Sequence, residues 1–161
     1  VFKGLIEDKF TPVVERKLAA YGIETVRHTV TDDAPEHILA AIEGMRAAGV
    51  GLILCTGGMS VDPDDMTPAA IKQSGARIVT YGAPVLPGAM LLLGYFADGV
   101  PILGLPGCVM YAKATVFDIL LPRIAAGVEI AKRDIVRLGC GGLCLNCKVC
   151  TYPNCGFGKE S

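Results

Sequence analysis

The sequence predicts an α/β fold: a three-layer sandwich with a mostly parallel sheet, joined by a β-hairpin and a cysteine-rich C-terminal extension. In the first half of the chain, apolar runs of strand length alternate with amphipathic segments, which is typical of a parallel sheet covered by helices. In the second half, two apolar runs flank Ala97-Asp98-Gly99, which indicates a hairpin. Five cysteines crowd into residues 140–155 and indicate an appendage of a different kind.

Periodicity and helix signals define the elements of the first half. Thr11 opens the first helix, Asp32 or Asp33 caps the second, and Glu36 completes a capping box with Asp33. Thr67 is the expected N-cap of a short third helix. In order, we expect a helix over 11–22, a strand over 24–30, a helix over 33–49, a strand over 51–56, a helix over 68–74 and a strand over 76–81.

The second half begins with a Pro/Gly loop. The hairpin strands are expected over 90–96 and 100–105, and a long helix over 109–126 follows a strand-to-helix corner at Pro106-Gly107. Residues 1–127 would then form the α/β domain, and residues 128–161 a linker and a cysteine-rich metal-binding tail.

Composition narrows the classes of function. The 161 residues are 52% hydrophobic, with a mean hydropathy of +0.47, which suits one domain with a substantial core and an appendage. A net charge of −1, without a basic stripe, argues against nucleic acid. Neither a membrane-length apolar run nor a signal peptide is visible, so a cytoplasmic location without membrane partners is expected. The high apolar fraction favours a homo-oligomer, a dimer or trimer.

The most informative stretch runs from Thr56 to Pro68. It places two glycines, two hydroxyls and three aspartates between a buried strand and a helix, which is where open α/β sheets bind ligands. Gly57 and Gly58 can turn sharply and let backbone N–H groups approach an anion. The aspartates can hold a cation or move a proton.

Four segments carry a resemblance to a known family. Residues 56–60, Thr-Gly-Gly-Met-Ser, resemble the molybdenum-insertase branch of the molybdopterin-binding domains of molybdenum-cofactor biosynthesis. Residues 63–68, Pro-Asp-Asp-Met-Thr-Pro, are closer to the molybdopterin adenylyltransferase branch. Residues 84–90 and 104–107 resemble the insertase pattern, in the right order. The resemblance covers roughly residues 1–127 and implies a further strand before Gly4.

The resemblance implies catalytic roles for Asp65 and Asp32. Asp65 matches an aspartate that acts at the pyran-dithiolate end of molybdopterin, although a carboxylate near a helix N-terminus can also serve the helix dipole alone. Asp32 matches a second family aspartate, with helix capping as its alternative role. Because parallel strands end at one edge of a sheet, both carboxylates can face one crevice and bind Mg²⁺.

Further residues would hold the ligand. Ser60 lines the pocket in the family, although a hydroxyl that satisfies its own loop is the commoner arrangement. The insertase branch has Gly where this chain has Asp62, which leaves the metal geometry open, and Asn where it has Cys108, whose default role is a buried, inert thiol. We expect His28 and His37 to be structural. The cofactor-binding set is Thr56, Gly57, Gly58, Ser60, Asp62, Pro106, Gly107 and Cys108.

The cysteine-rich tail lies outside the resemblance. Its Cys-x2-Cys-x2-Cys core is similar to a ferredoxin-type iron–sulfur run, and Zn²⁺ is the main alternative, because four close thiolates make a closed tetrahedral site. One thiol is left over in either case, and a flexible, metal-free tail is the third alternative. The metal-ligand candidates are Cys140, Cys144, Cys147, Cys150 and Cys155.

Two functions follow from these observations. The first is binding of molybdopterin, or its adenylylated form, by a molybdopterin molybdenumtransferase or adenylyltransferase-like enzyme, for which the resemblance implies ATP and molybdate as further substrates. The second is a non-enzymatic module that delivers or senses molybdopterin and carries a redox or metal tail. Turnover with ATP or molybdate distinguishes the first from the second.

Overall fold

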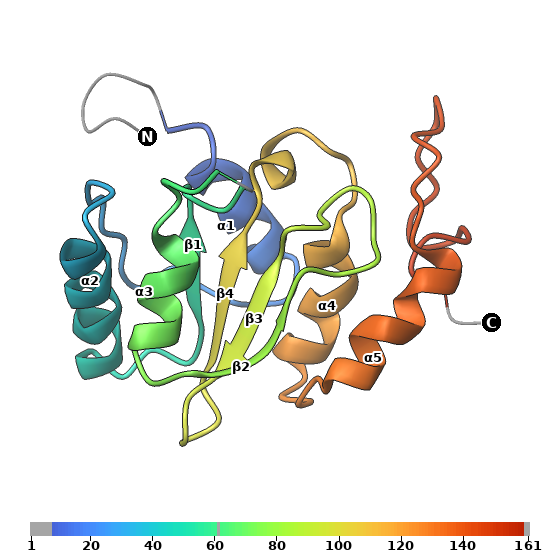
Figure 1. The fold of residues 1–161 in the computed structure, drawn as a ribbon. Helices are drawn as coiled ribbons and strands as arrows, with labels where there is room; N and C mark the ends of the chain where they lie inside the picture. The colour runs from blue at the N-terminus through green and yellow to red at the C-terminus, as the bar shows by residue number, and fades with distance from the viewer. Residues whose placement is uncertain (1–7, 61, 160–161) are drawn as a thin grey trace.

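A computed structural model describes residues 8–60 and 62–159 and shows a sheet with helices around it (Figure 1). The strands are β1 (Ile53–Thr56), β2 (Arg77–Tyr81), β3 (Leu92–Tyr95) and β4 (Pro101–Leu105). The helices are α1 (Thr11–Ala19), α2 (Pro35–Ala47), α3 (Thr67–Gln73), α4 (Val116–Ala125) and α5 (Lys132–Arg137), with 3-10 turns at η1 (Gly107–Met110) and η2 (Leu138–Gly141).

The sheet is mixed, so the prediction of a mostly parallel sheet is wrong for the described residues. The strand order is β1-β4-β3-β2, and only β1 and β4 pair in parallel. The turn at Ala97–Gly99 reverses the chain between β3 and β4, so these strands pair antiparallel, as a hairpin must. The loop between β2 and β3 contains no crossover helix, and this pair is antiparallel as well.

The strand predicted over residues 24–30 does not form. Those residues have no assigned strand structure, and Val26 is 75% exposed. A cavity of about 640 Å³ lies between this segment and the neighbouring β1 and α2. Alternation of side chains predicts a strand only where a partner takes up the backbone N–H and C=O groups. The further strand expected before Gly4 lies outside the described residues.

Two apolar clusters on opposite faces of the sheet confirm the three-layer arrangement. Alternate residues of β3 and β4 point to opposite faces: Leu92 and Ile102 to one, Leu93 and Leu103 to the other. The first face is covered by α2 and α3, and the second by α1, α4 and α5 (Figure 1). Burial of these side chains is the main source of stability for the scaffold.

The tail is joined to the second cluster, so the structure does not set it apart as a distinct extension. Phe157 is 5% exposed and belongs to the cluster that contains Phe117 and Leu138. The Tyr152 hydroxyl donates to the Asp118 carbonyl at 2.9 Å. The sequence prediction overlooked these contacts because glycine, asparagine and cysteine dominate residues 140–156 around half-buried Tyr152 and just before buried Phe157.

Helix caps differ from the predicted ones. Helix α2 begins at Pro35 after Ala34, and α3 begins at Thr67 after Met66, without a side-chain cap in either case. A capping box is present at α4, where Asp118 Oδ2 accepts hydrogen bonds from the Thr115 backbone N–H at 2.7 Å and from the Thr115 hydroxyl at 2.9 Å. Thr67 is instead buried, and its hydroxyl donates a hydrogen bond to the Gly57 carbonyl in the preceding loop.

Candidate functional site

Two loops leave the sheet side by side at one edge. Thr56 at the end of β1 and Leu105 at the end of β4 are register partners in the parallel pair. Gly57 and Pro106 follow these partners directly, so the 57–66 loop and the 106–110 turn begin on neighbouring strands. The two segments singled out from the sequence therefore meet at the carboxyl ends of parallel strands, where open α/β sheets bind ligands.

Asp65 closes the 57–66 loop on itself. One of its carboxylate oxygens, Oδ2, accepts hydrogen bonds from the backbone N–H and the hydroxyl of Ser60, both at 2.6 Å. The Asp65 N–H donates to the Asp62 carbonyl at 3.0 Å, and the Asp62 N–H donates to Ser60 Oγ at 3.2 Å. This network fixes Ser60, Asp62 and Asp65 as one unit on an exposed loop. It is compatible with a Ser60 hydroxyl that only satisfies its own loop and with one that also lines a ligand pocket.

Two buried anchors hold this loop against the sheet. Met59 is 4% exposed and lies over Gly104 of β4, where an added Cβ would be 2.5 Å from Met59 Sδ and Cε. The Thr67 hydroxyl donates to the Gly57 carbonyl at 2.9 Å. Gly58, at φ +57°, passes so close to Thr67 that a Cβ there would lie 2.7 Å from its Oγ1. The glycines therefore serve close packing as well as the turn.

Tyr81 is a site residue that sequence reasoning missed. Its hydroxyl, at the end of β2, donates to the Ser60 carbonyl at 3.2 Å. Desolvation and the nearby Asp65 carboxylate raise the pKa of Tyr81, so the phenol keeps its proton and remains a donor at neutral pH. Nothing in the local sequence pattern could have revealed this contact, because it joins residues 21 positions apart.

Asp32 lies beside the large cavity, together with Thr56 and Gly57. Its Oδ1 is 2.6 Å from His37 Nδ1 and accepts from the Ala34 N–H at 3.3 Å. His37 thus pairs with Asp32 at the surface, and its structural role stays a prediction. Asp65 is not among the residues that line this cavity, so the structure brings Asp32 to the strand end without placing the two carboxylates in one described pocket.

Asp8 adds another carboxylate to the same cavity and was also missed. It accepts from the Thr11 hydroxyl at 2.5 Å and from the Phe10 N–H at 2.8 Å, and it lies 3.7 Å from His28 Nε2. The hydrogen bond from Thr11 leads the effects that lower the pKa of Asp8. His28 lies outside any described strand and is half exposed, and its structural role stays a prediction.

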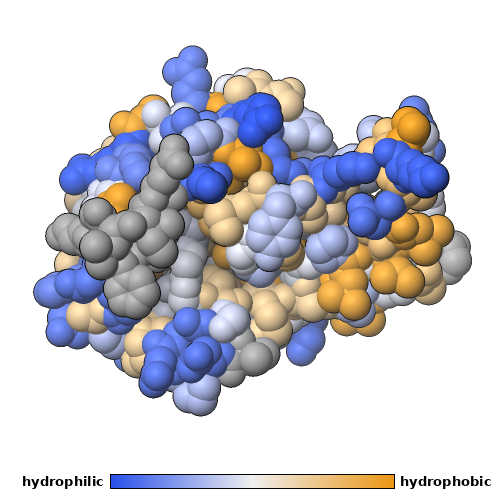
Figure 2. Space-filling model, turned by 90° about the horizontal axis from the view of Figure 1, so that it is seen from above, coloured by the Kyte–Doolittle hydropathy of each residue, from blue (hydrophilic) through white to orange (hydrophobic). Residues whose placement is uncertain are grey.

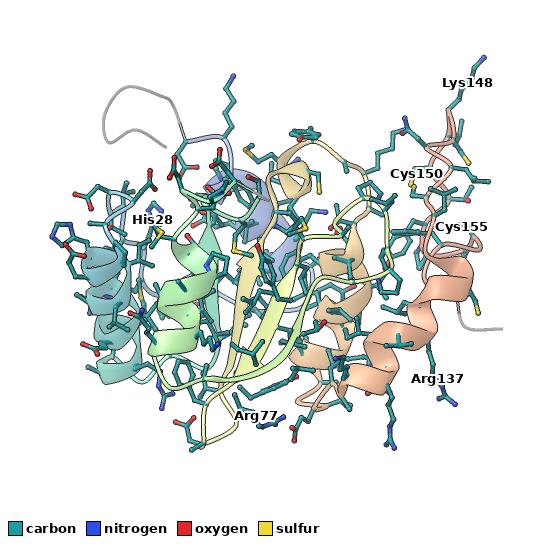
Figure 3. All side chains as sticks on the ribbon, viewed as in Figure 1. His28, Arg77, Arg137, Lys148, Cys150 and Cys155 are labelled. Carbon is teal, nitrogen blue, oxygen red and sulfur yellow. The ribbon has the colours of Figure 1, made fainter. Side chains whose placement is uncertain are left out.

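The predicted metal ligands are not gathered into a site. Over residues 8–60 and 62–159, no three His, Cys, Asp or Glu side chains are arranged to hold a metal ion. Among the tail cysteines, Cys144 and Cys155 are half-buried, whereas Cys140, Cys147 and Cys150 are exposed. Figure 3 shows Cys150 and Cys155 on the tail, which rises beyond α5. Bound Mg²⁺, iron–sulfur and Zn²⁺ remain predictions.

The two remaining cysteines lie within the α/β domain. Burial raises the pKa of Cys55 to about 12 and raises that of Cys108 to a smaller extent. Cys108 is half-buried in η1, next to Pro106 and Gly107. Cys55 is half-buried as well and lines the large cavity, so its raised pKa, which keeps the thiol protonated, is what limits its reactivity.

We expect Cys55 to resist alkylation in the native protein. At pH 8 a thiol with a pKa of about 12 is ionised about a thousandfold less than one near 9, and only the thiolate reacts. Iodoacetamide followed by peptide mass spectrometry should label exposed Cys140 and Cys147 long before Cys55. The raised pKa stabilises the fold below pH 9 and this contribution is lost as pH approaches 12. Equal labelling of all three thiols would contradict this assignment.

Comparison with known proteins assigns a family to the chain. The chain matches the family model described as "Probable molybdopterin binding domain" over residues 1–126. It therefore belongs to the molybdopterin-binding domain family, as the resemblance in the four segments indicated. No helix in the described part of the chain is long and apolar enough to cross a membrane.

Individual relatives carry different names. A molybdopterin molybdenumtransferase of Synechococcus elongatus (strain ATCC 33912 / PCC 7942 / FACHB-805) is 27% identical over 125 residues, 76% of this chain and 31% of that protein. A molybdenum cofactor biosynthesis bifunctional protein of the same organism is 39% identical over 70 residues, 44% of this chain and 22% of that protein. A CinA-like protein of Mycobacterium sp. (strain JLS) is 32% identical over 77 residues, 48% of this chain and 18% of that protein. The chain thus spans less than a third of each relative's length.

Proposed function

We propose that the chain binds molybdopterin, or its adenylylated form, at the edge where the 57–66 loop and the 106–110 turn meet. The observation that carries this proposal is the register pairing of Thr56 with Leu105, which starts both loops on neighbouring parallel strands. Family membership supports the identity of the ligand. The reaction would be adenylyl transfer to molybdopterin or molybdenum insertion with release of AMP, with ATP and molybdate as co-substrates.

Backbone amides would hold the anionic parts of the ligand. Gly57 and Gly58 have positive φ values of 82° and 57°, which lets their N–H groups turn toward the loop interior. Pro106 has no N–H to donate and shapes the corner, whereas Gly107, which is exposed and has no side chain, leads into η1 and can offer its backbone N–H. Uncharged N–H donors of this kind suit the binding of a phosphate here, because a chain with a net charge of −1 has no excess of basic side chains for that purpose.

The carboxylates would serve the reacting end. Asp65 is presented at the loop by its two bonds from Ser60, and Asp32 stands at the strand end that leads to Gly57. Asp65 and Asp32 would be the residues to hold a Mg²⁺ ion, which would supply positive charge to offset that of a ligand phosphate, because Mg²⁺ favours few protein carboxylates together with phosphate oxygens.

A non-enzymatic module for delivery or sensing is the second proposed function. Relatives named CinA-like match 48% of this chain, so similar sequence also occurs in proteins named otherwise than molybdenum transferases. Saturable binding without turnover of ATP or molybdate would favour this function over the enzyme.

We expect Asp65→Asn to weaken molybdopterin binding at least tenfold while the fold remains intact. The change removes a charged acceptor from an exposed loop, where hydrogen bonds to a charged group contribute about 1.5–3 kcal/mol and core packing is unaffected. Asp64→Asn is the matched control, because it removes the same charge one residue away while Asp65 keeps its bonds to Ser60. Equilibrium binding and circular dichroism measure both variants; wild-type affinity in Asp65→Asn would refute its role.

Two proposals concern the tail and the assembly. A thiolate metal centre, iron–sulfur or zinc, would draw on the tail cysteines, whose segment has its apolar side chains exposed rather than packed, so that metal binding could order it. A homo-oligomer, dimer or trimer, would cover hydrophobic side chains gathered on the side where α5 and the tail lie (Figure 2). Exposed members of that surface include Val136, Leu143, Leu145 and Val149.

A further inference from the structure

A second cavity of about 400 Å³ collects most of the thiols of this chain. It lies between the tail and the segment that follows β4, and five of the seven cysteines line it. Four of them come from the tail: Cys144, Cys147, Cys150 and Cys155. The fifth is Cys108, which comes from η1 at the candidate pterin edge. Cys140 is not part of the lining, although its sequence spacing made it an equal candidate.

Both walls of this cavity are fixed to the same scaffold. Leu86 donates to the Gly142 carbonyl at 2.7 Å and accepts from the Cys144 N–H at 2.8 Å, which docks the base of the tail. At the far end, Phe157 is buried and Tyr152 meets it edge-on, with ring centroids 6.1 Å apart. The tail therefore returns to the domain on both sides of its cysteine run and cannot swing away from Cys108 as a free arm.

The middle of the tail is the weakly packed part. Leu145 and Val149 are 78% and 77% exposed. The Lys113 ammonium reaches across from the domain and donates to the carbonyls of Cys147 and Lys148, at 3.0 and 3.3 Å. In Figure 3, Lys148 marks the tip and points away from the body. A segment with so little apolar contact can move its thiols inward at small cost, because few packed side chains must be displaced.

We propose that this cavity is a thiolate metal site in which Cys108 of the α/β domain supplies one ligand and the tail supplies the others. The inference rests on the proposed tail metal and changes its ligand set: Cys108 enters, Cys140 drops out, and three of the four tail thiols in the lining complete the set. Thiolate sulfur is the preferred ligand of Zn²⁺ and of iron–sulfur clusters, and four such ligands close a tetrahedral site. Metal binding would hold the tail against the 106–110 turn, which begins at the proposed molybdopterin site.

The test is metal binding by the reduced full chain under anaerobic conditions, with Co²⁺ as a spectroscopic probe and Zn²⁺ as competitor. The wild type should bind one Co²⁺ with sulfur-to-cobalt charge transfer. Cys108→Ser should bind at least tenfold more weakly and lose about a quarter of that intensity, as one of four thiolates. Cys140→Ser and Asp65→Asn should match the wild type. Incubation with ferrous iron and sulfide forms the parallel arm: a stable brown product that requires Cys108 assigns the same site to a cluster.

The outcomes separate the proposals. Wild-type binding by Cys108→Ser, or an equal loss in Cys140→Ser, would overturn the inference while leaving a metal in the tail. Absence of Co²⁺, Zn²⁺ and iron binding in the wild type would overturn both. Neither result bears on molybdopterin binding, which is measured separately through Asp65.

Discussion

Gly58→Ala should unfold more readily than the wild type and lose its affinity for molybdopterin. Gly58 adopts φ +57°, and a Cβ at this position would lie 2.7 Å from Thr67 Oγ1. The new methyl group would push the Thr67 hydroxyl away from the Gly57 carbonyl, which it bonds at 2.9 Å. Backbone strain and a lost buried hydrogen bond together cost about 2–4 kcal/mol of unfolding free energy.

Gly57→Ala is the matched control. Gly57 also has a positive φ, +82°, but a Cβ there would meet no atom within 4 Å. Both variants therefore carry strain from the left-handed backbone, and only Gly58→Ala adds the collision with Thr67. Urea unfolding of the two variants should show a larger loss for Gly58→Ala; equal losses would show that the contact with Thr67 does not constrain the loop.

Gly104→Val should disturb the ligand loop from beneath. A Cβ at Gly104 would come within 2.5 Å of Met59 Sδ and Cε and within 3.3 Å of Leu92 Cβ. Because Met59 is the flexible partner, we expect it to be expelled from its site on β4 and to release the 57–66 loop. Overpacking of this kind costs about 1–3 kcal/mol.

A double-mutant cycle with Met59→Ala isolates this contact. Met59→Ala alone opens a cavity under the loop and should cost about 2–5 kcal/mol, since the side chain is almost fully buried. In the double variant the valine can enter the vacated space, so the combined loss should be smaller than the sum of the two. Strictly additive losses would show that Met59 and residue 104 do not share this space.

Local sequence signals predicted the strand ends at which the proposed site lies. The glycine pair at residues 57–58 and the corner at Pro106-Gly107 both mark strand ends, and the structure places these ends on paired strands. The hairpin at Ala97–Gly99 was equally readable, because a turn of this length specifies its own strand pairing. Such features depend on a few consecutive residues.

Features that depend on distant partners were missed. The 24–30 segment alternates like a strand but pairs with no strand among the described residues, and the direction of β3 depends on its connections rather than on its residues. Tyr81 reaches Ser60 and Met59 covers Gly104 only after folding. The docking of Phe157 likewise could not be inferred from a tail dominated by glycine and cysteine.

The central claim is that molybdopterin binds where the two loops meet, and an NMR titration of the ¹⁵N-labelled chain tests it most directly. Added molybdopterin should shift the amide signals of Gly57, Gly58, Ser60 and Gly107 along one saturable curve, with smaller changes at Asp65. Signals from the cysteine-lined cavity, such as those of Asn146 and Thr151, should stay in place. Saturable shifts confined to that cavity, or no shifts at all, would contradict the account.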